Sequence, residues 1–157
     1  CLLGQSTTTY DAAGTITSAI TGPLSAHQIT DDRIKAVVSG FLGAQLQVPP
    51  AFSAKKHKGV RAYKQARQGN FIALDPVTIM IHDLMITHCD INAGLLNVRV
   101  RCSKGTYIRS LIHDIGQKLG VGAYITALHR SAIGSYTDSA SLVTLTPDTI
   151  ASALFTV

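Results

Sequence analysis

Residues 101–120 read RCSKGTYIRSLIHDIGQKLG and connect two different hydrophobic patterns. The run that leads into them, LLNVRVRC at residues 95–102, alternates apolar and polar side chains, which is typical of a strand with one buried face. From residue 108 the apolar side chains recur at helical spacing, and Gly120 follows as a helix terminator. The expected buried stripe is Ile108, Leu111, Ile112, Ile115 and Leu119. The stretch therefore predicts a strand, a turn at residues 103–105 and an amphipathic helix.

Further elements are predicted on the N-terminal side of this corner. Residues 76–89, PVTIMIHDLMITHC, are rich in β-formers and are expected to pair antiparallel with the strand at 95–102. A helix is expected from Thr30 to a C-terminal cap at Gly43, and a shorter one over residues 60–68. Turn residues at 11–14 predict a hairpin or an extended loop. These patterns predict a mixed α+β fold with an antiparallel-rich sheet flanked by helices.

The remaining segments give weaker patterns. A short strand is expected before a turn at Gly59, and residues 123–138 are rich in strand formers. Pro147 can open a last short helix. With 157 residues and a mean hydropathy of +0.23, the chain is long enough to bury one core, so a single domain is expected.

Positive charge is concentrated in one segment. The chain has 14 Lys and Arg against 9 acids, all of them aspartates, which gives a net charge of +5. Six of the basic residues fall between positions 55 and 67, and no acid occurs between Asp32 and Asp75. The six are Lys55, Lys56, Lys58, Arg61, Lys64 and Arg67. Such a basic patch suggests a polyanionic partner, although a modest excess of positive charge is also common on ordinary proteins.

The sequence contains no pattern typical of a metal site, a disulfide framework or a transmembrane helix. The three cysteines are scattered and contain no C-x-x-C pair, which argues against a zinc site and favours a reducing compartment. The six histidines lack metal-ligand spacing. No apolar run is long enough for a transmembrane helix, so a soluble, cytoplasmic protein is expected.

The turn at 103–105 could bind an anion. Lys104 and Gly105 precede a helix start, where free backbone N–H groups attract negative charge, and Arg109 adds a planar fork suited to carboxylate or phosphate. Tyr107 could stack on a nucleic-acid base. The alternatives remain open, because Arg109 could be a solvated helix residue and Tyr107 could pack at the sheet edge.

Three blocks of the sequence resemble a known family. PPAFSAKKHKGVRAYKQARQG (49–69), the block at 101–120, and GAYITALHR (122–130) are similar to consecutive motifs of the TruB-type tRNA pseudouridine synthases. The similarity runs from GQSTTTYDAAG to about Leu142, nearly the whole chain. The resemblance implies the pseudouridine synthase fold and isomerisation of uridine 55 in the T-loop of tRNA, by base flipping and without a metal or organic cofactor. It also implies that the T-arm of tRNA is the partner.

The resemblance also implies roles for individual residues. Arg109 matches an arginine that pairs with the catalytic aspartate, and an opposite charge nearby favours the carboxylate form. Tyr107 matches a tyrosine beside the uracil, and Leu128 matches an apolar residue of the uracil pocket. Lys56 is expected to position substrate RNA, and Lys104, at the anion site described above, is expected to bind substrate. The expected RNA-binding residues of the patch are Lys55, Lys58, Arg61, Tyr63 and Arg67.

The family's catalytic aspartate has no counterpart in the sequence. In the family it lies in a G-x-L-D-P-x-A-x-G loop, upstream of the position that matches Cys1. Asp75 follows a leucine and precedes a proline but lacks the flanking glycines, so it is interpreted as a loop residue, and Asp11 and Asp114 as turn and helix residues. The chain is therefore expected to be a fragment of the catalytic domain, without its N-terminal part or a C-terminal PUA domain. We expect this piece to be inactive, with Arg109 unpaired.

Two other functions are compatible with the same residues. A noncatalytic RNA-binding module would use the basic 55–67 patch and the 101–109 corner, without any aspartate. A metabolic enzyme could hold a nucleotide phosphate at Lys104 and Gly105, but the turn lacks the glycines and the hydroxyl residue of a Walker loop. The oligomeric state is not encoded in any pattern of the sequence, and a monomer is expected.

Overall fold

The computed structural model describes residues 1–57, 59–70, 72, 74–134 and 136–137, and it divides into two compact units. The first unit, Cys1–Thr126, contains the main sheet and the helices. The second, Ala127–Val157, contributes one short hairpin to the described residues, formed by β10 (Ala132–Ile133) and β11 (Tyr136–Thr137). The predicted helix at Pro147 falls outside the described residues.

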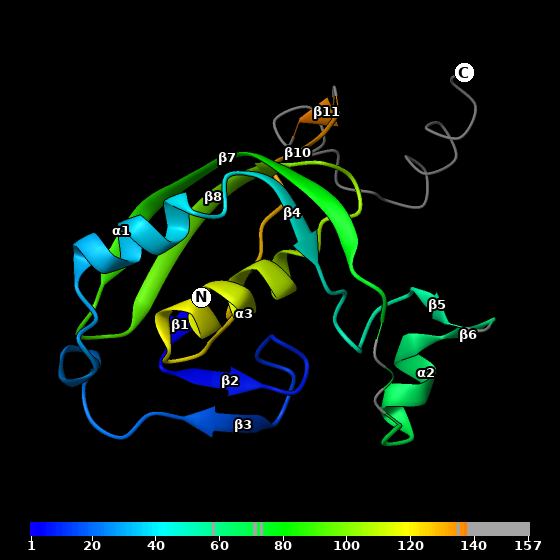
Figure 1. Cartoon of the computed structure of the whole chain (residues 1–157), viewed down its shortest axis with the longest axis horizontal. Coiled ribbons are helices and arrows are strands. Elements are labelled where there is room, and N and C mark those ends of the chain that lie inside the picture. The colour runs from blue at the N-terminus through cyan, green and yellow to red at the C-terminus, as the bar shows by residue number, and fades with distance from the viewer. Residues whose placement is uncertain (58, 71, 73, 135, 138–157) are drawn as a thin grey trace, which may run out of the picture. The chain divides into compact units, whose positions relative to one another are not determined.

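A five-stranded sheet forms the centre of the first unit. Every neighbouring pair is antiparallel. The strands lie in the order β4 (Gly43–Gln47), β7 (Val77–Asp90), β8 (Leu95–Cys102), β1 (Leu2–Leu3) and β9 (Ala123–Tyr124). The predicted pairing of the two β-rich runs is therefore confirmed. Register shifts interrupt β7 after Ile81 and after Ile86, and such irregularities bend a strand. In Figure 1 the β7–β8 pair arches over the helix α3 (Ile108–Leu119).

The other elements surround this sheet. The predicted hairpin near the N-terminus consists of β2 (Gln5–Thr7) and β3 (Ile16–Ala19). A 3-10 helix, η1 (Leu24–His27), leads into α1 (Asp31–Ser39). A second hairpin, β5 (Lys56–His57) and β6 (Val60–Arg61), continues directly into α2 (Ala62–Arg67). The helix expected over 60–68 thus begins two residues later, because Val60 and Arg61 pair with β5 instead.

Helix α1 begins as its sequence predicts and ends earlier. The hydroxyl of Thr30 accepts the backbone N–H of Arg33 at 3.2 Å, and two aspartates occupy the first turn. The cap predicted at Gly43 is wrong, since the helix ends at Ser39 and its C-cap is Gly40. Gly43 has φ of 90° and starts β4, which pairs with β7 along its whole length. The local pattern GAQLQ predicts no strand at 43–47, because the strand is formed by pairing with a distant segment.

Helix α3 contributes the centre of the core. Its predicted stripe is buried at Leu111, Ile112, Ile115 and Leu119, and Ile108 is partly buried. These side chains pack with Ile79, Ile81, Leu84 and Leu96 of the sheet. Gly120 ends the helix with φ of 79°, as expected. The buried stripe fixes the rotation of α3, so the helix face that carries Arg109 is fixed as well.

Candidate functional site

The side chain of Arg109 connects α3 to two segments distant in sequence. Its Nη1 donates to the carbonyl of Thr9 at 2.9 Å and to Oδ2 of Asp11 at 3.3 Å. Its Nη2 donates to the carbonyl of Phe52 at 2.8 Å. The side chains of Arg109 and Asp11 are only 26% and 29% exposed, so the ion pair lies half-buried at the start of α3. The expectation that Arg109 is unpaired in this chain is therefore wrong.

Asp11 acts as a turn residue and as an ion-pair partner at once. Its Oδ1 accepts the backbone N–H of Ala13 at 3.0 Å and the hydroxyl of Thr9 at 2.5 Å, which is the expected turn chemistry. Its carbonyl accepts the hydroxyl of Thr7 at 2.7 Å. These bonds leave Oδ2 directed at Arg109. The turn signal in the sequence is correct but incomplete, because the second role depends on a residue 98 positions away.

The neighbouring residue, Tyr10, packs on the same helix. Its backbone adopts φ of 62°, which is uncommon for a side chain of this size. Its ring stacks on that of His113, with centroids 3.8 Å apart and planes 11° from parallel. One turn further along, Gln117 Nε2 donates to Ser6 Oγ at 3.5 Å. Arg109, His113 and Gln117 are spaced by four residues, and we call them the α3 seam.

The electrostatics of the seam follow from burial. Burial lowers the pKa of His113 and favours its neutral form. Burial raises the pKa of Tyr10, and the nearby Asp114 raises it further. Burial also raises the pKa of Asp114 to about 6. The sequence does not predict these pKa shifts, because they depend on burial. It contains only the i, i+4, i+8 spacing of Arg109, His113 and Gln117, which places them on one face of a helix.

Asp114 gives a testable pH dependence. Its folded-state pKa of about 6 lies above its unfolded value of 3.8, so the folded state binds the proton more tightly. The contribution of Asp114 to stability therefore falls as the pH rises from about 4 to about 6. We expect Asp114→Asn to gain stability relative to the parent across this window and then to level off. Thermal unfolding of both proteins between pH 4 and 7.5 tests this, and a constant difference would contradict it.

Tyr107 and the turn before it lie next to Arg109 in the chain. Tyr107 is the residue that precedes α3 and is half-buried. Lys104 and Gly105 form an exposed turn in which Gly105 has φ of 83°. Two hydrogen bonds attach this turn to β7, from Ser103 N to the carbonyl of Met80 at 2.8 Å and from Met80 N to Ser103 Oγ at 3.0 Å. Anion binding at Lys104 stays a prediction.

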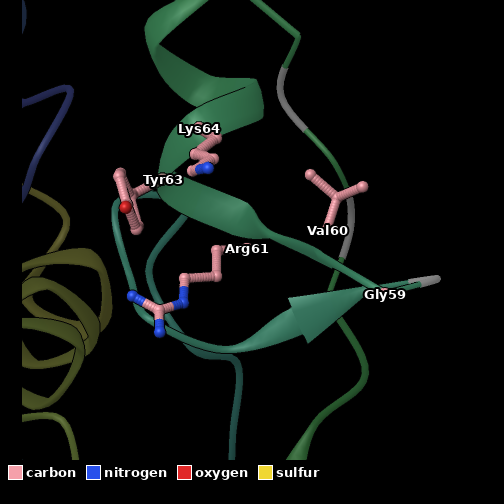
Figure 2. A pocket seen from close by; sticks show the side chains of 5 residues that line it. All are labelled: Gly59, Val60, Arg61, Tyr63 and Lys64. Atoms are coloured by element: carbon pink, nitrogen blue, oxygen red, sulfur yellow. The ribbon is translucent and has the colours of Figure 1, made fainter.

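The basic patch forms a surface feature around β6 and α2. Arg61, Lys64 and Arg67 are exposed, and the guanidinium of Arg67 lies 5.5 Å from the ring centroid of Tyr63. An open hollow of about 500 Å³ is lined by Gly59, Val60, Arg61, Tyr63 and Lys64. Figure 2 shows the side chains of Arg61 and Tyr63 on the same side of the hairpin, away from Val60. Two cationic side chains, Arg61 and Lys64, and the aromatic ring of Tyr63 thus line the same hollow.

The other predicted site residues make few contacts that bear on their predicted roles. The carbonyl of Lys55 accepts the backbone N–H of Ala62 at 2.8 Å, and Lys56 pairs with Arg61 in the β5–β6 hairpin. Lys58 lies outside the described residues. Leu128 belongs to the second unit and is 60% exposed, so its contact with a uracil pocket stays a prediction. Asp75 is exposed and lies in the loop before β7, as expected.

Within the part of the chain that is described, other site chemistry is not found. No helix there is long and apolar enough to cross a membrane. No group of three or more metal-binding side chains there could hold a metal ion.

Comparison with known proteins gives consistent similarities. The family model described as "TruB family pseudouridylate synthase (N terminal domain)" matches residues 1–108, and "tRNA pseudouridylate synthase B C-terminal domain" matches residues 109–154. The chain is 44% identical to tRNA pseudouridine synthase B of Nitrosococcus oceani over 136 residues, covering 87% of this chain and 42% of that protein. It is 42% identical to the protein of the same name from Aquifex aeolicus, covering 83% and 44%.

A solved structure is also similar. A chain in the crystal structure of a Cbf5–Nop10–Gar1 complex aligns with a TM-score of 0.54 and 30% identity, covering 70% of this chain and 28% of that one. The chain spans half or less of the length of the first curated relatives it matches.

Proposed function

Because the chain belongs to the TruB family of pseudouridylate synthases, we propose that its protein converts uridine 55 in the T-loop of tRNA to pseudouridine. The observation that supports this proposal is the set of hydrogen bonds that Arg109, two residues after Tyr107 in the chain, makes to segments from two other parts of the fold. On this proposal the T-arm of tRNA is the partner, no cofactor takes part, and the protein works as a cytoplasmic monomer.

The hydrogen bonds of Arg109 leave room for a second acid. A guanidinium carries five N–H groups, and three hydrogen bonds occupy Nη1 fully and Nη2 once among the described residues. One N–H on Nε and one on Nη2 remain for a further acceptor. We propose that a catalytic aspartate outside this chain takes them, and that residues 1–157 form part of the catalytic domain.

On this proposal, three residues of the chain have separate roles in the reaction. The target base leaves its stack, its N1–C1′ bond breaks, the ring turns and a C5–C1′ bond forms; the proton on C5 is lost and N1 gains a proton, so the product is an isomer of the substrate. On this proposal Tyr107 lies beside the flipped base, and Arg109 keeps the catalytic carboxylate ionised and oriented. Asp11 balances the charge of Arg109 and fixes its rotamer.

Release of tritium from a T-loop RNA labelled at C5 of the target uridine tests the proposal. We expect turnover by the full-length gene product and none by the 157-residue chain, because the second carboxylate is missing from the latter. Turnover by the 157-residue chain would overturn the proposal that the catalytic aspartate lies outside this chain. It would point instead to Asp11 as the catalytic acid, because Asp11 is the carboxylate bonded to Arg109 among the described residues. The gene upstream of Cys1 is expected to encode G-x-L-D-P-x-A-x-G.

Noncatalytic RNA binding is a second candidate, favoured by the hollow at Arg61, Tyr63 and Lys64. Aromatic rings and cations together bind nucleic acid with strong salt dependence. If the full-length protein binds T-loop RNA, loses affinity steeply with salt and releases no tritium, this candidate replaces the enzyme.

A further inference from the structure

The side-chain amide of Gln47 bonds to both main-chain polar groups of Tyr107. Gln47 Oε1 accepts the backbone N–H of Tyr107 at 2.8 Å, and Gln47 Nε2 donates to the Tyr107 carbonyl at 3.1 Å. Gln47 is the last residue of β4 and is only 2% exposed, and it lies 60 positions from Tyr107. A buried amide with both of its ends used is a specific contact rather than a solvated side chain.

These two hydrogen bonds fix the backbone direction at Tyr107. The N–H belongs to the peptide plane before its Cα, and the carbonyl belongs to the plane after it. Holding both planes holds φ and ψ, here −93° and 106°, and so sets the direction in which the side chain leaves the backbone. The same carbonyl accepts the N–H of Leu111 at 3.0 Å, so the start of α3 is held at the same point.

A purely structural role can be separated from this one. The hydroxyl of Ser110 donates to the carbonyl of Val48 at 2.9 Å and Ser110 is 1% exposed, so it joins α3 to the residue that directly follows β4. If Gln47 served only to attach β4 to α3, removing either contact would have the same kind of effect. Ser110 contacts no atom of Tyr107 in these hydrogen bonds, whereas Gln47 contacts its backbone twice.

We propose that Gln47 is a positioning residue for pseudouridylation, which acts through the backbone of Tyr107 to place its ring against the flipped base. The proposal rests on the proposed function through the role given to Tyr107. Gln47 itself is only 2% exposed, and both ends of its amide bond to the backbone of Tyr107, so its effect is expected to pass through Tyr107. Its contribution is therefore expected in the rate of the bound complex and not in RNA affinity.

The test compares two variants of the full-length protein in the tritium-release assay. Gln47→Met keeps the length of the side chain and removes both hydrogen bonds, and Ser110→Ala is the matched control for the β4–α3 junction. We expect Gln47→Met to lower kcat about 10- to 100-fold with KM for T-loop RNA unchanged within about twofold. Ser110→Ala is expected to lower the midpoint of thermal unfolding and to leave kcat within about twofold.

Each outcome decides the proposal. Equal kcat losses in the two variants, or a rise in KM at constant kcat for Gln47→Met, would overturn it. If Gln47→Met does not fold, Gln47→Leu replaces it, because its smaller branched side chain also removes both hydrogen bonds; parental kcat in that variant would also overturn the proposal. A parent protein without tritium release would overturn the proposed function and this inference together, whereas an active parent with a fully active Gln47→Met would overturn this inference alone.

Discussion

Replacing Arg109 by methionine in the full-length protein will lower kcat about 100- to 1000-fold, while T-loop RNA is still bound. Methionine keeps most of the length of the side chain and removes every N–H donor. The carbonyls of Thr9 and Phe52 and the carboxylate of Asp11 then lose their common partner. The proposed catalytic acid loses its counter-charge at the same time. Tritium release and RNA filter binding measure the two quantities separately.

The matched control for this variant is Arg33→Met. Arg33, in α1, also donates to backbone carbonyls from more than one element, those of His27, Gln28 and Leu119, but it contacts the C-terminal end of α3 and not its start. We expect Arg33→Met to lower stability and leave kcat within about twofold. Near-normal turnover by Arg109→Met, or an equal loss in both variants, would remove the role assigned to Arg109.

Gly116→Ala is expected to have the largest effect on folding. A Cβ at this position would overlap the backbone N of Ala123 and the carbonyl carbon of Gly122. Both are backbone atoms at the start of β9, in its first residue and the residue before it, so relief requires α3 to move away from the sheet. We expect a loss of about 3 kcal/mol or more in the free energy of unfolding, and a protein that accumulates poorly. Chemical denaturation followed by circular dichroism measures it.

Gly40→Ala is the control for that change. Gly40 has an ordinary helical φ of −67°, and its added Cβ would meet the carbonyl of Val37 at 3.3 Å. We therefore expect a change of about 1 kcal/mol or less. If Gly116→Ala were as stable as Gly40→Ala, the close approach of α3 and β9 described above would be incorrect.

The parts of the fold that were predictable from sequence are those with a local signal. Strands β7 and β8 and helix α3 have long periodic patterns, and the buried residues follow them. Strand β4 was missed because GAQLQ has little β-propensity and is held by pairing with β7. The end of α1 was misplaced for the same reason, since Gly43 belongs to that strand.

The site shows the same division. Arg109 and Tyr107 could be selected from a motif, but their partners could not. Asp11 has a complete local explanation as a turn residue, which concealed its bond to Arg109. Gln47 is a polar residue at a strand end, and only the fold brings it to Tyr107. Contacts between segments 60 to 98 positions apart leave no periodic trace in a single sequence.

The α3 seam also fixes the length of the helix. Each residue of an α-helix is turned by about 100° from the one before. A single residue inserted between Arg109 and His113 would therefore rotate His113 and Gln117 away from Tyr10 and Ser6, while Arg109 stayed in place. Insertions and deletions of single residues within the twelve residues of α3 are therefore expected to prevent correct folding. In the exposed turn at Lys104 and Gly105, the same changes are expected to leave the fold intact. The number of residues in α3 thus sets the spacing of the three seam contacts.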